Sequence, residues 1–180
     1  MGLLTYSVSS AGVLTYIDQG AGGGQAYGVW GDGDFIYVAD GDSGLRSYSV
    51  DGSGDLTAID VDDPGGSAQN VWGDGSYLYL ATHTGGLHTY SVDGSGNLTL
   101  VDSDDQGDQA YDIWADDNFI YLANGEGGLH TYTVDGSGIL THVDSDDQGG
   151  VALSVWKEGD IIYLANQFSG VATYSVDGSG

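Results

Sequence analysis

The sequence predicts an all-β fold built from repeated antiparallel sheets, and three observations support this prediction. The chain of 180 residues repeats itself every 42 residues without insertion or deletion. Each repeat consists of short runs rich in β-branched and aromatic residues, separated by Asp-Gly and Gly-x-Gly turns. No window shows the periodicity of an amphipathic helix. A meander of four short strands at this repeat length is typical of β-propeller blades, which are four-stranded sheets arranged around an axis.

The repeated unit is nearly constant along the chain. Four full copies and one partial copy are present, at residues 2–43, 44–85, 86–127, 128–169 and 170–180. The third and fourth copies share 26 identities in 42 positions. Repeats this similar arise by recent duplication or by deliberate construction, so the pattern fits an engineered or environmental repeat sequence. The length suits one domain with a substantial core, and we expect residues 1–180 to form a single β-propeller domain of four four-stranded blade units.

Within one unit, four segments have the composition of strands, at residues 68–72, 77–81, 87–92 and 98–102. Turns such as Asp93-Gly94 separate them, because glycine supplies the positive φ angles that tight hairpins require. The second segment is apolar on both faces, which indicates a strand covered by a sheet on each side. We therefore expect the strand that ends at Trp72 to be innermost and the fourth segment to be outermost.

Aromatic residues recur at fixed positions of the first two strands in every unit. Their regular spacing is compatible with a surface for stacking sugars, but positions inside strands favour packing in the core. The residues concerned are Trp30, Trp72, Trp114 and Trp156, and Tyr37, Tyr79, Tyr121 and Tyr163.

The order of strands along the chain leaves the number of blades in a closed ring open. The sequence starts with the third and fourth strands of a blade and finishes with the first, second and third. One third strand is therefore redundant, either residues 3–8 or residues 171–176. The chain could form a four-bladed ring, share strands with a second chain in an eight-bladed homodimeric ring, or be an excerpt of a longer array. We favour self-assembly by strand sharing, because four blades must splay widely to close.

Charge and composition exclude several classes of function. The chain carries 27 acidic residues against two basic ones, Arg46 and Lys157, for a formal net charge of −25. This balance rules out phosphate-driven binding of nucleic acid and argues against docking on anionic membranes. The absence of cysteine excludes disulfides and zinc–thiolate sites. No signal peptide or apolar run long enough to cross a bilayer is seen, so we expect a soluble protein of unknown location.

Two acidic segments resemble part of a calcium-binding loop. Residues 102–107 and 144–149 both read DSDDQG, with carboxylates at positions one and three and glycine at position six. Position twelve, which would supply a bidentate glutamate, is Ile113 or Val155 instead. The segments are therefore either calcium ligands or, as we favour, solvated acidic turns, and no other cofactor is indicated. The candidate ligands are Asp102, Asp104, Asp105, Asp144, Asp146 and Asp147.

Other polar residues give weaker signals. His88 and His130 occupy the strand position that holds Arg46 in another unit, and no His-x-His spacing indicates a transition-metal site. The innermost strand varies from unit to unit at one position, where Asp112 is the acidic member. A catalytic site would require unique polar residues that converge on one channel mouth, and this variation is a thin basis for one.

Two segments carry a resemblance to known propeller families. Residues 70–81, which read NVWGDGSYLYLA, and residues 85–88, GGLH, resemble the LVIVD-type repeat. The hairpin YSVDGSGNLT at residues 90–99 is similar to hairpins of lactonase-like propellers of the 6-phosphogluconolactonase type. Both resemblances imply blade architecture but say little about function, because propellers support many unrelated activities.

Three functional hypotheses follow from these observations. The leading one is a non-enzymatic structural or interaction scaffold that presents acidic loops to protein or small-molecule ligands of unknown identity. The alternatives are a lactonase-like hydrolase, which the hairpin resemblance implies, and a calcium-binding propeller module, which the acidic segments suggest.

The charge generates a testable prediction. Repulsion among the 27 acidic residues should destabilise the folded state at low ionic strength. Because the Debye length falls from ~30 Å at 0.01 M salt to ~8 Å at 0.15 M, sodium chloride should relieve this repulsion. We expect the melting temperature, followed by circular dichroism, to rise between these two concentrations. A flat response would contradict the prediction.

Overall fold

The computed structural model describes residues 2–176, and its regular secondary structure in this range consists of β-strands alone, which confirms the predicted all-β class. The first hairpin is formed by β1 (Leu4–Val8) and β2 (Leu14–Gln19). Within residues 2–176, no helical segment has the length and apolar character that crossing a bilayer requires.

Three complete four-stranded sheets follow the hairpin. The first contains β3 (Gly28–Gly31), β4 (Phe35–Ala39), β5 (Leu45–Val50) and β6 (Leu56–Asp62). The second contains β7 (Ala68–Gly73), β8 (Leu78–Thr82), β9 (Gly86–Val92) and β10 (Leu98–Asp104). The third contains β11 (Asp112–Ala115), β12 (Ile120–Ala123), β13 (Leu129–Val134) and β14 (Leu140–Asp146). The last sheet has three described strands, β15 (Ala152–Glu158), β16 (Ile161–Asn166) and β17 (Gly170–Ser175).

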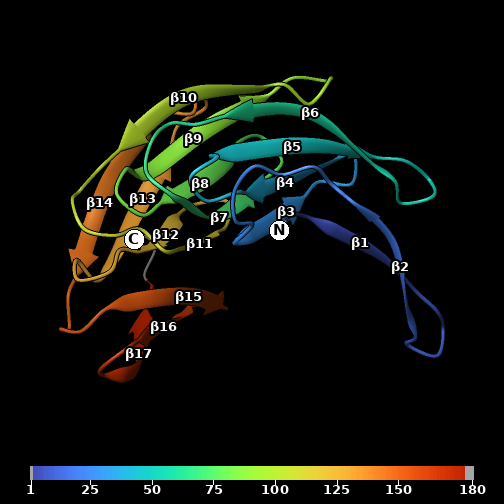
Figure 1. Cartoon of the computed structure of the whole chain (residues 1–180). Helices are drawn as coiled ribbons and strands as arrows, with labels where there is room; N and C mark the ends of the chain where they lie inside the picture. Colours follow the sequence, from blue (N-terminus) through green and yellow to red (C-terminus); the bar gives the residue numbers. More distant parts are fainter. Residues whose placement is uncertain (1, 177–180) are drawn as a thin grey trace.

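Every sheet is an antiparallel meander whose strands pair in sequence order. Figure 1 shows the sheets following one another along an open arc, with the β1–β2 hairpin at one end and β15–β17 at the other. Each four-stranded sheet takes its first two strands from one sequence unit and its last two from the next. The described strands do not close into a ring, so the number of blades in a closed ring stays a prediction.

Aspartate and glycine shape the hairpin between the third and fourth strands. In the second sheet, the Asp93 Oδ1 atom accepts hydrogen bonds from the backbone N–H groups of Ser95 (2.8 Å) and Asn97 (3.0 Å). Gly96 adopts a φ of +85°, and a Cβ atom there would lie 2.9 Å from the Phe35 ring of the preceding sheet. Glycine is thus required both by the turn and by the close approach of two sheets.

The core lies between consecutive sheets, as the apolar character of the second strands predicted. All residues of β8 are buried. One face of the second sheet presents Tyr79 and Leu87, and these pack against Ile113 and Ile120 of the third sheet. Burying a side chain of this size contributes roughly 1.5–3 kcal/mol, so the stability of each sheet depends on the neighbours that cover it. The tyrosines of the second strands are buried in the three complete sheets, whereas the tryptophans beside them are only partly buried.

A carboxylate hydrogen bond, here called the carboxylate lock, recurs between consecutive outer strands. In each case an aspartate Oδ2 atom accepts the backbone N–H of the leucine that begins the outer strand of the next sheet. The three pairs are Asp18–Leu56, Asp60–Leu98 and Asp102–Leu140, each at 2.9 Å. Accepting this bond lowers the pKa of Asp18, because the N–H group stabilises the charged carboxylate.

A second bond, here called the hydroxyl lock, joins the third strand of one sheet to the hairpin of the next. A threonine or serine hydroxyl donates to the carbonyl of a hairpin glycine. The pairs are Thr5–Gly54 (2.8 Å), Ser47–Gly96 (2.7 Å) and Thr89–Gly138 (2.7 Å). The two locks fix the lateral position of the first hairpin on the first sheet and of each complete sheet on the next.

The outer strands are longer than the sequence predicted. The fourth segment of the second sheet continues past Asp102 to Asp104, and its equivalent in the third sheet continues to Asp146. The first half of each predicted acidic loop is therefore strand, with Asp102 paired to Thr89 and Asp104 to Leu87. An outermost strand has one solvated edge, so its backbone can pair on one side while its carboxylates stay in water.

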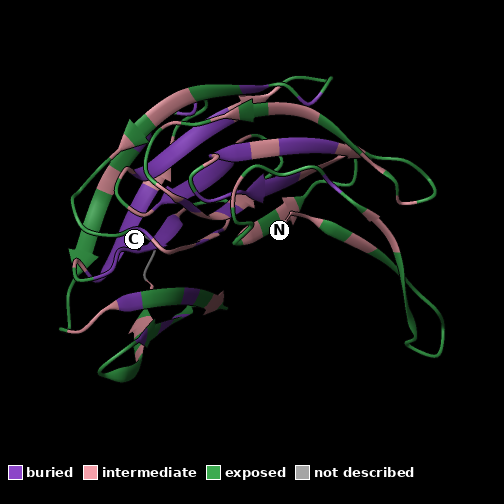
Figure 2. Cartoon of the chain, in the orientation of Figure 1, coloured by how far each residue is buried: buried purple, intermediate pink, exposed green. Residues whose placement is uncertain are grey.

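The two ends of the arc are uncovered. Tyr163 and Trp156 in the last sheet are 39% and 57% exposed, whereas Tyr121, which is equivalent to Tyr163, is 0% exposed. At the other end Val29 is 58% exposed, compared with 1% for its equivalent Val71. Figure 2 shows the same contrast, with buried residues concentrated in the three complete sheets.

Candidate functional site

The varying residues of the innermost strands form a hydrogen-bonded row around Asp112. The Asp112 Oδ1 atom accepts hydrogen bonds from the Asn70 side-chain amide and from the backbone N–H of Ile113 (3.0 Å). Its Oδ2 atom accepts from the Ser154 hydroxyl (2.5 Å) and the Val155 N–H (3.0 Å). The carboxylate thus links three consecutive sheets, and each of its oxygens already accepts two hydrogen bonds.

Polar residues after the second strands hold the loops that connect one sheet to the next. The Asp40 Oδ2 atom accepts hydrogen bonds from the N–H groups of Gly23 (3.1 Å) and Gly24 (3.2 Å) and from Arg46 Nε (2.6 Å). In the third sheet the equivalent Asn124 amide donates to the Gly107 carbonyl at 2.9 Å.

His88 and His130, which the sequence placed at the Arg46 position, belong to the same arrangement. The His88 Nε2 atom lies 2.9 Å from the Thr82 hydroxyl, and the His130 Nε2 atom lies 3.2 Å from the Gly127 carbonyl oxygen. Both imidazoles are buried, and this burial lowers the pKa of each. They act as neutral hydrogen-bonding groups within the loop supports.

The structure also brings together two histidines that the sequence did not connect. The His130 Nδ1 atom lies 3.2 Å from the His142 Nε2 atom, so one ring must donate a proton to the other. A β-bulge between Thr131 and Tyr132 makes the two histidines diagonal neighbours on β13 and β14. The register of this hairpin was the signal that could have paired them. Within residues 2–176, no group of three or more His, Cys, Asp or Glu side chains is placed to hold a metal ion.

The six candidate calcium ligands all accept hydrogen bonds from groups of the chain itself. Asp102 forms a carboxylate lock, and Asp144 accepts the N–H of its neighbour Ser145 at 2.9 Å. The remaining four bind the turn that follows each strand, through the pairs Asp104–Gln106 (2.5 Å), Asp105–Gly107 (2.9 Å), Asp146–Gln148 (2.8 Å) and Asp147–Gly149 (2.6 Å). The proposal that these residues bind calcium stays a prediction.

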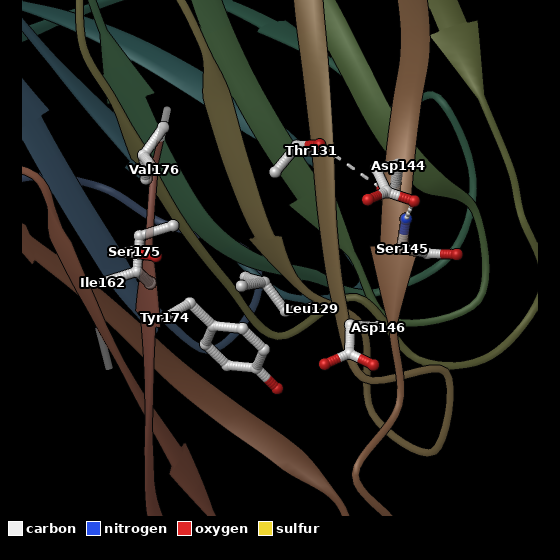
Figure 3. Close-up of a pocket in the computed structure, with 9 residues that line it drawn as sticks. All are labelled: Leu129, Thr131, Asp144, Ser145, Asp146, Ile162, Tyr174, Ser175 and Val176. Carbon is white, nitrogen blue, oxygen red and sulfur yellow. Dashed lines mark hydrogen bonds between the residues drawn. The ribbon is translucent and has the colours of Figure 1, made fainter. Parts of the chain in front are cut away.

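A groove runs between the outer strand of the third sheet and the last described strand. Leu129, Thr131, Asp144, Ile162, Tyr174 and Val176 line it. Figure 3 shows the Thr131 and Asp144 side chains on one wall and Tyr174 and Val176 on the opposite wall. Burial, and then the charge of Asp146, raises the pKa of the Tyr174 hydroxyl. Leu129 and Ile162 make the groove apolar, and Asp144 adds a carboxylate to its edge.

Comparison with known proteins agrees with this architecture. Residues 23–46, 65–93 and 107–135 match the LVIVD repeat, so the chain carries LVIVD repeats and is a repeat protein of the β-propeller type. No curated protein gives a significant match. The sequence resemblance to the LVIVD repeat is thus confirmed.

Two solved structures have a similar fold at very low sequence identity. The crystal structure of the computationally designed Ika4 protein matches with a TM-score of 0.70 and 7% identity, over 86% of this chain and 92% of that chain. The computationally designed Ika8 protein matches with a TM-score of 0.65 and 8% identity, over 86% of this chain and 47% of that chain. The likeness supports the repeated sheet architecture.

The buried histidines predict a pH dependence of stability. Because the pKa values of His88 and His130 are lowered in the folded state, the unfolded chain binds more protons below its histidine pKa of about 6.5. The free energy of unfolding should therefore fall as the pH decreases from 7 to 5.5. We expect His130→Ala to weaken this dependence, whereas His83→Ala, at a half-exposed loop position, should leave it unchanged. Urea titrations at pH 7 and pH 5.5 measure the free energy of unfolding. An equal change between the two pH values for the wild type and both variants would contradict the prediction.

The acidic turns predict a weak and unselective response to divalent ions. A calcium site would stabilise the fold by about 2.7 kcal/mol at a hundredfold excess over its dissociation constant. Calcium accepts irregular carboxylate shells more readily than magnesium, so a specific site should separate the two ions. We expect equal shifts in melting temperature for both ions in 0.15 M salt, unaltered by Asp104→Asn or Asp146→Asn. A larger calcium shift that these substitutions remove would show a calcium site.

Proposed function

We propose that this protein is a non-enzymatic structural scaffold, a propeller module that self-assembles and presents acidic strands and turns on its outer surface. The observation that carries the proposal is the Asp112 carboxylate. It is the acidic residue best placed for catalysis in the inner row, and all of its hydrogen-bonding capacity is used to link Asn70, Ser154 and two backbone amides. A general base must instead have a free lone pair directed at its substrate.

The basic residues support the same conclusion. Arg46 is bound to Asp40 at 2.6 Å, and Lys157 is bound to Asp116 at 2.7 Å while lying over the Trp114 ring. A phosphorylated or carboxylate substrate would be held by arginine or lysine. The two cations of this chain are both used to hold its own carboxylates.

We further propose a specific number of blades for the ring. Each chain contributes four blade units, and two chains together complete a ring of eight blades. The uncovered faces at the two ends of the arc support this. Tyr163 and Trp156 are equivalent to residues that pack against the following sheet in the complete blades. Val29 is equivalent to Val71, which packs against the preceding sheet. Two different complementary faces make a head-to-tail contact, which closes into a ring when the rotation permits. A four-bladed ring from one chain is the alternative.

Two measurements test the proposed function. Sedimentation equilibrium should give twice the 18.6 kDa mass of one chain, and a panel of lactones should show no hydrolysis above buffer. Hydrolysis that Asp112→Asn abolishes without a change in the circular dichroism spectrum would contradict the scaffold. A compact species with the mass of one chain at all concentrations would contradict the assembly with a second chain.

A further inference from the structure

The groove beside β17 contains the two lock residues of the third sheet. Asp18, Asp60 and Asp102 each accept a leucine N–H from the next sheet, and Asp144 is the next member of this series, 42 residues after Asp102. Asp144 is exposed, whereas the other three are half-buried. Within residues 2–176 its carboxylate accepts only the N–H of its neighbour Ser145.

The hydroxyl lock forms a similar series within the described residues. Thr5, Ser47 and Thr89 each donate to a hairpin glycine carbonyl of the next sheet. Thr131 is the equivalent residue, and within residues 2–176 its hydroxyl makes only a long contact of 3.4 Å with the Asp144 carbonyl in its own sheet. Both residues face the groove (Figure 3), so the groove presents an acceptor and a donor at the spacing of the two locks.

One described segment carries the complementary groups. The repeat places Leu14 in the position of Leu56, Leu98 and Leu140, and Gly12 in the position of Gly54, Gly96 and Gly138. Leu14 is 63% exposed, whereas Leu98 and Leu140 are 9% and 8% exposed. Within residues 2–176, the N–H of Leu14 and the carbonyl of Gly12 do not take part in either lock.

The hairpin that carries these groups lies at the opposite end of the arc from the groove (Figure 1). There β2 is already attached to its own chain, because the Asp18 carboxylate binds the Leu56 N–H. A strand from a second copy can therefore enter the groove while it remains locked to its own first sheet.

We infer that β2 of a second copy docks in the groove as the outer strand of the last sheet. The resulting blade is composite, with β15, β16 and β17 from one chain and β2 from the other. This inference rests on the proposed self-assembly and specifies its contacts. The Leu14 N–H of one chain donates to Asp144 of the other, and Thr131 donates to the Gly12 carbonyl.

The pairing register follows from the complete sheets. β5 pairs with β6 through Ser47–Asp60, Tyr48–Ala58 and Val50–Leu56. Transferred by the repeat, Thr173 pairs with Asp18, Tyr174 with Tyr16 and Val176 with Leu14 of the second copy. The Leu14 side chain then joins the cluster that contains Leu129 and Ile162. β1 and β17 are equivalent third strands of the repeat, so only one of them can pair with β2 in the composite blade. Because β17 lines the groove, β2 pairs with β17 of the other chain and separates from its own β1.

The test measures the dissociation constant of the full-length dimer by sedimentation for matched pairs of variants. Asp144→Ala should raise this constant roughly tenfold or more, because a hydrogen bond to a charged group is lost at each junction. Asp102→Ala, which removes the same lock inside the chain, should lower the melting temperature and leave the constant unchanged. Leu14→Glu should raise the constant on the order of a hundredfold, because it places a charge in an apolar cluster.

Val13→Glu controls for the added charge. Val13 is 62% exposed, two of its three equivalents are the polar residues Asp55 and Asn97, and the third, Ile139, is 44% exposed, so this variant should associate like the wild type. Mixing the Asp144→Ala and Leu14→Glu chains gives a further test, because a head-to-tail pair then retains one intact junction of two. The mixture should associate more tightly than the Leu14→Glu chain alone.

The possible results separate the docking of β2 from the self-assembly of the protein. A wild-type dimer whose association is unaffected by Asp144→Ala and Leu14→Glu would overturn the docking and leave the self-assembly intact. A wild-type monomer whose melting temperature is insensitive to both substitutions would overturn the docking and the self-assembly together. A monomer destabilised by both, as strongly as by Asp102→Ala, would show that β2 fills the groove of its own chain, which overturns the role of a second copy.

Discussion

The architecture depends on how each sheet is covered by the next. A four-stranded antiparallel sheet with a second strand as apolar as Leu78–Thr82 is not stable with either face in water. The packing of Tyr79 and Leu87 on Ile113 and Ile120 supplies the hydrophobic cover, and the carboxylate and hydroxyl locks fix its position. Because both locks recur with the same pairs of positions in three successive junctions, an insertion within a unit would misplace them. This accounts for the constant 42-residue spacing.

The acidic composition has a structural explanation in the same hydrogen bonds. Asp93 binds hairpin N–H groups, Asp18 and Asp102 bind leucine N–H groups of the next sheet, and Asp112 binds two backbone amides. A carboxylate accepts such bonds more strongly than a neutral amide does. Aspartate also has a side chain short enough to reach the backbone of an adjacent strand or turn. Part of the net charge of −25 thus follows from repeating turns and junctions that are built on aspartate.

Much of the fold could be predicted from the sequence, because the signals are local and repeated. The apolar second strands and the Asp-Gly hairpins gave the strand order of every unit. The acidic segments were harder, since Asp102 and Asp104 lie in an outer strand whose pairing depends on a bulge after Leu100. The contact between His130 and His142 was missed for a similar reason, because a bulge sets which side chains are diagonal neighbours. The role of Asp112 depends on the spacing between sheets, which no single unit specifies.

We propose that the junction between chains uses the same lock between an aspartate carboxylate and a leucine amide as the junctions within the chain. Amide hydrogen exchange measures these leucines directly. We expect strong protection of the Leu56, Leu98 and Leu140 amides at every protein concentration. The Leu14 amide should be equally protected in the assembled protein and should lose this protection on dilution to the single chain. Rapid exchange of the Leu14 amide at all concentrations, with the other three protected, would contradict the claim that the junction between chains repeats the junction within them.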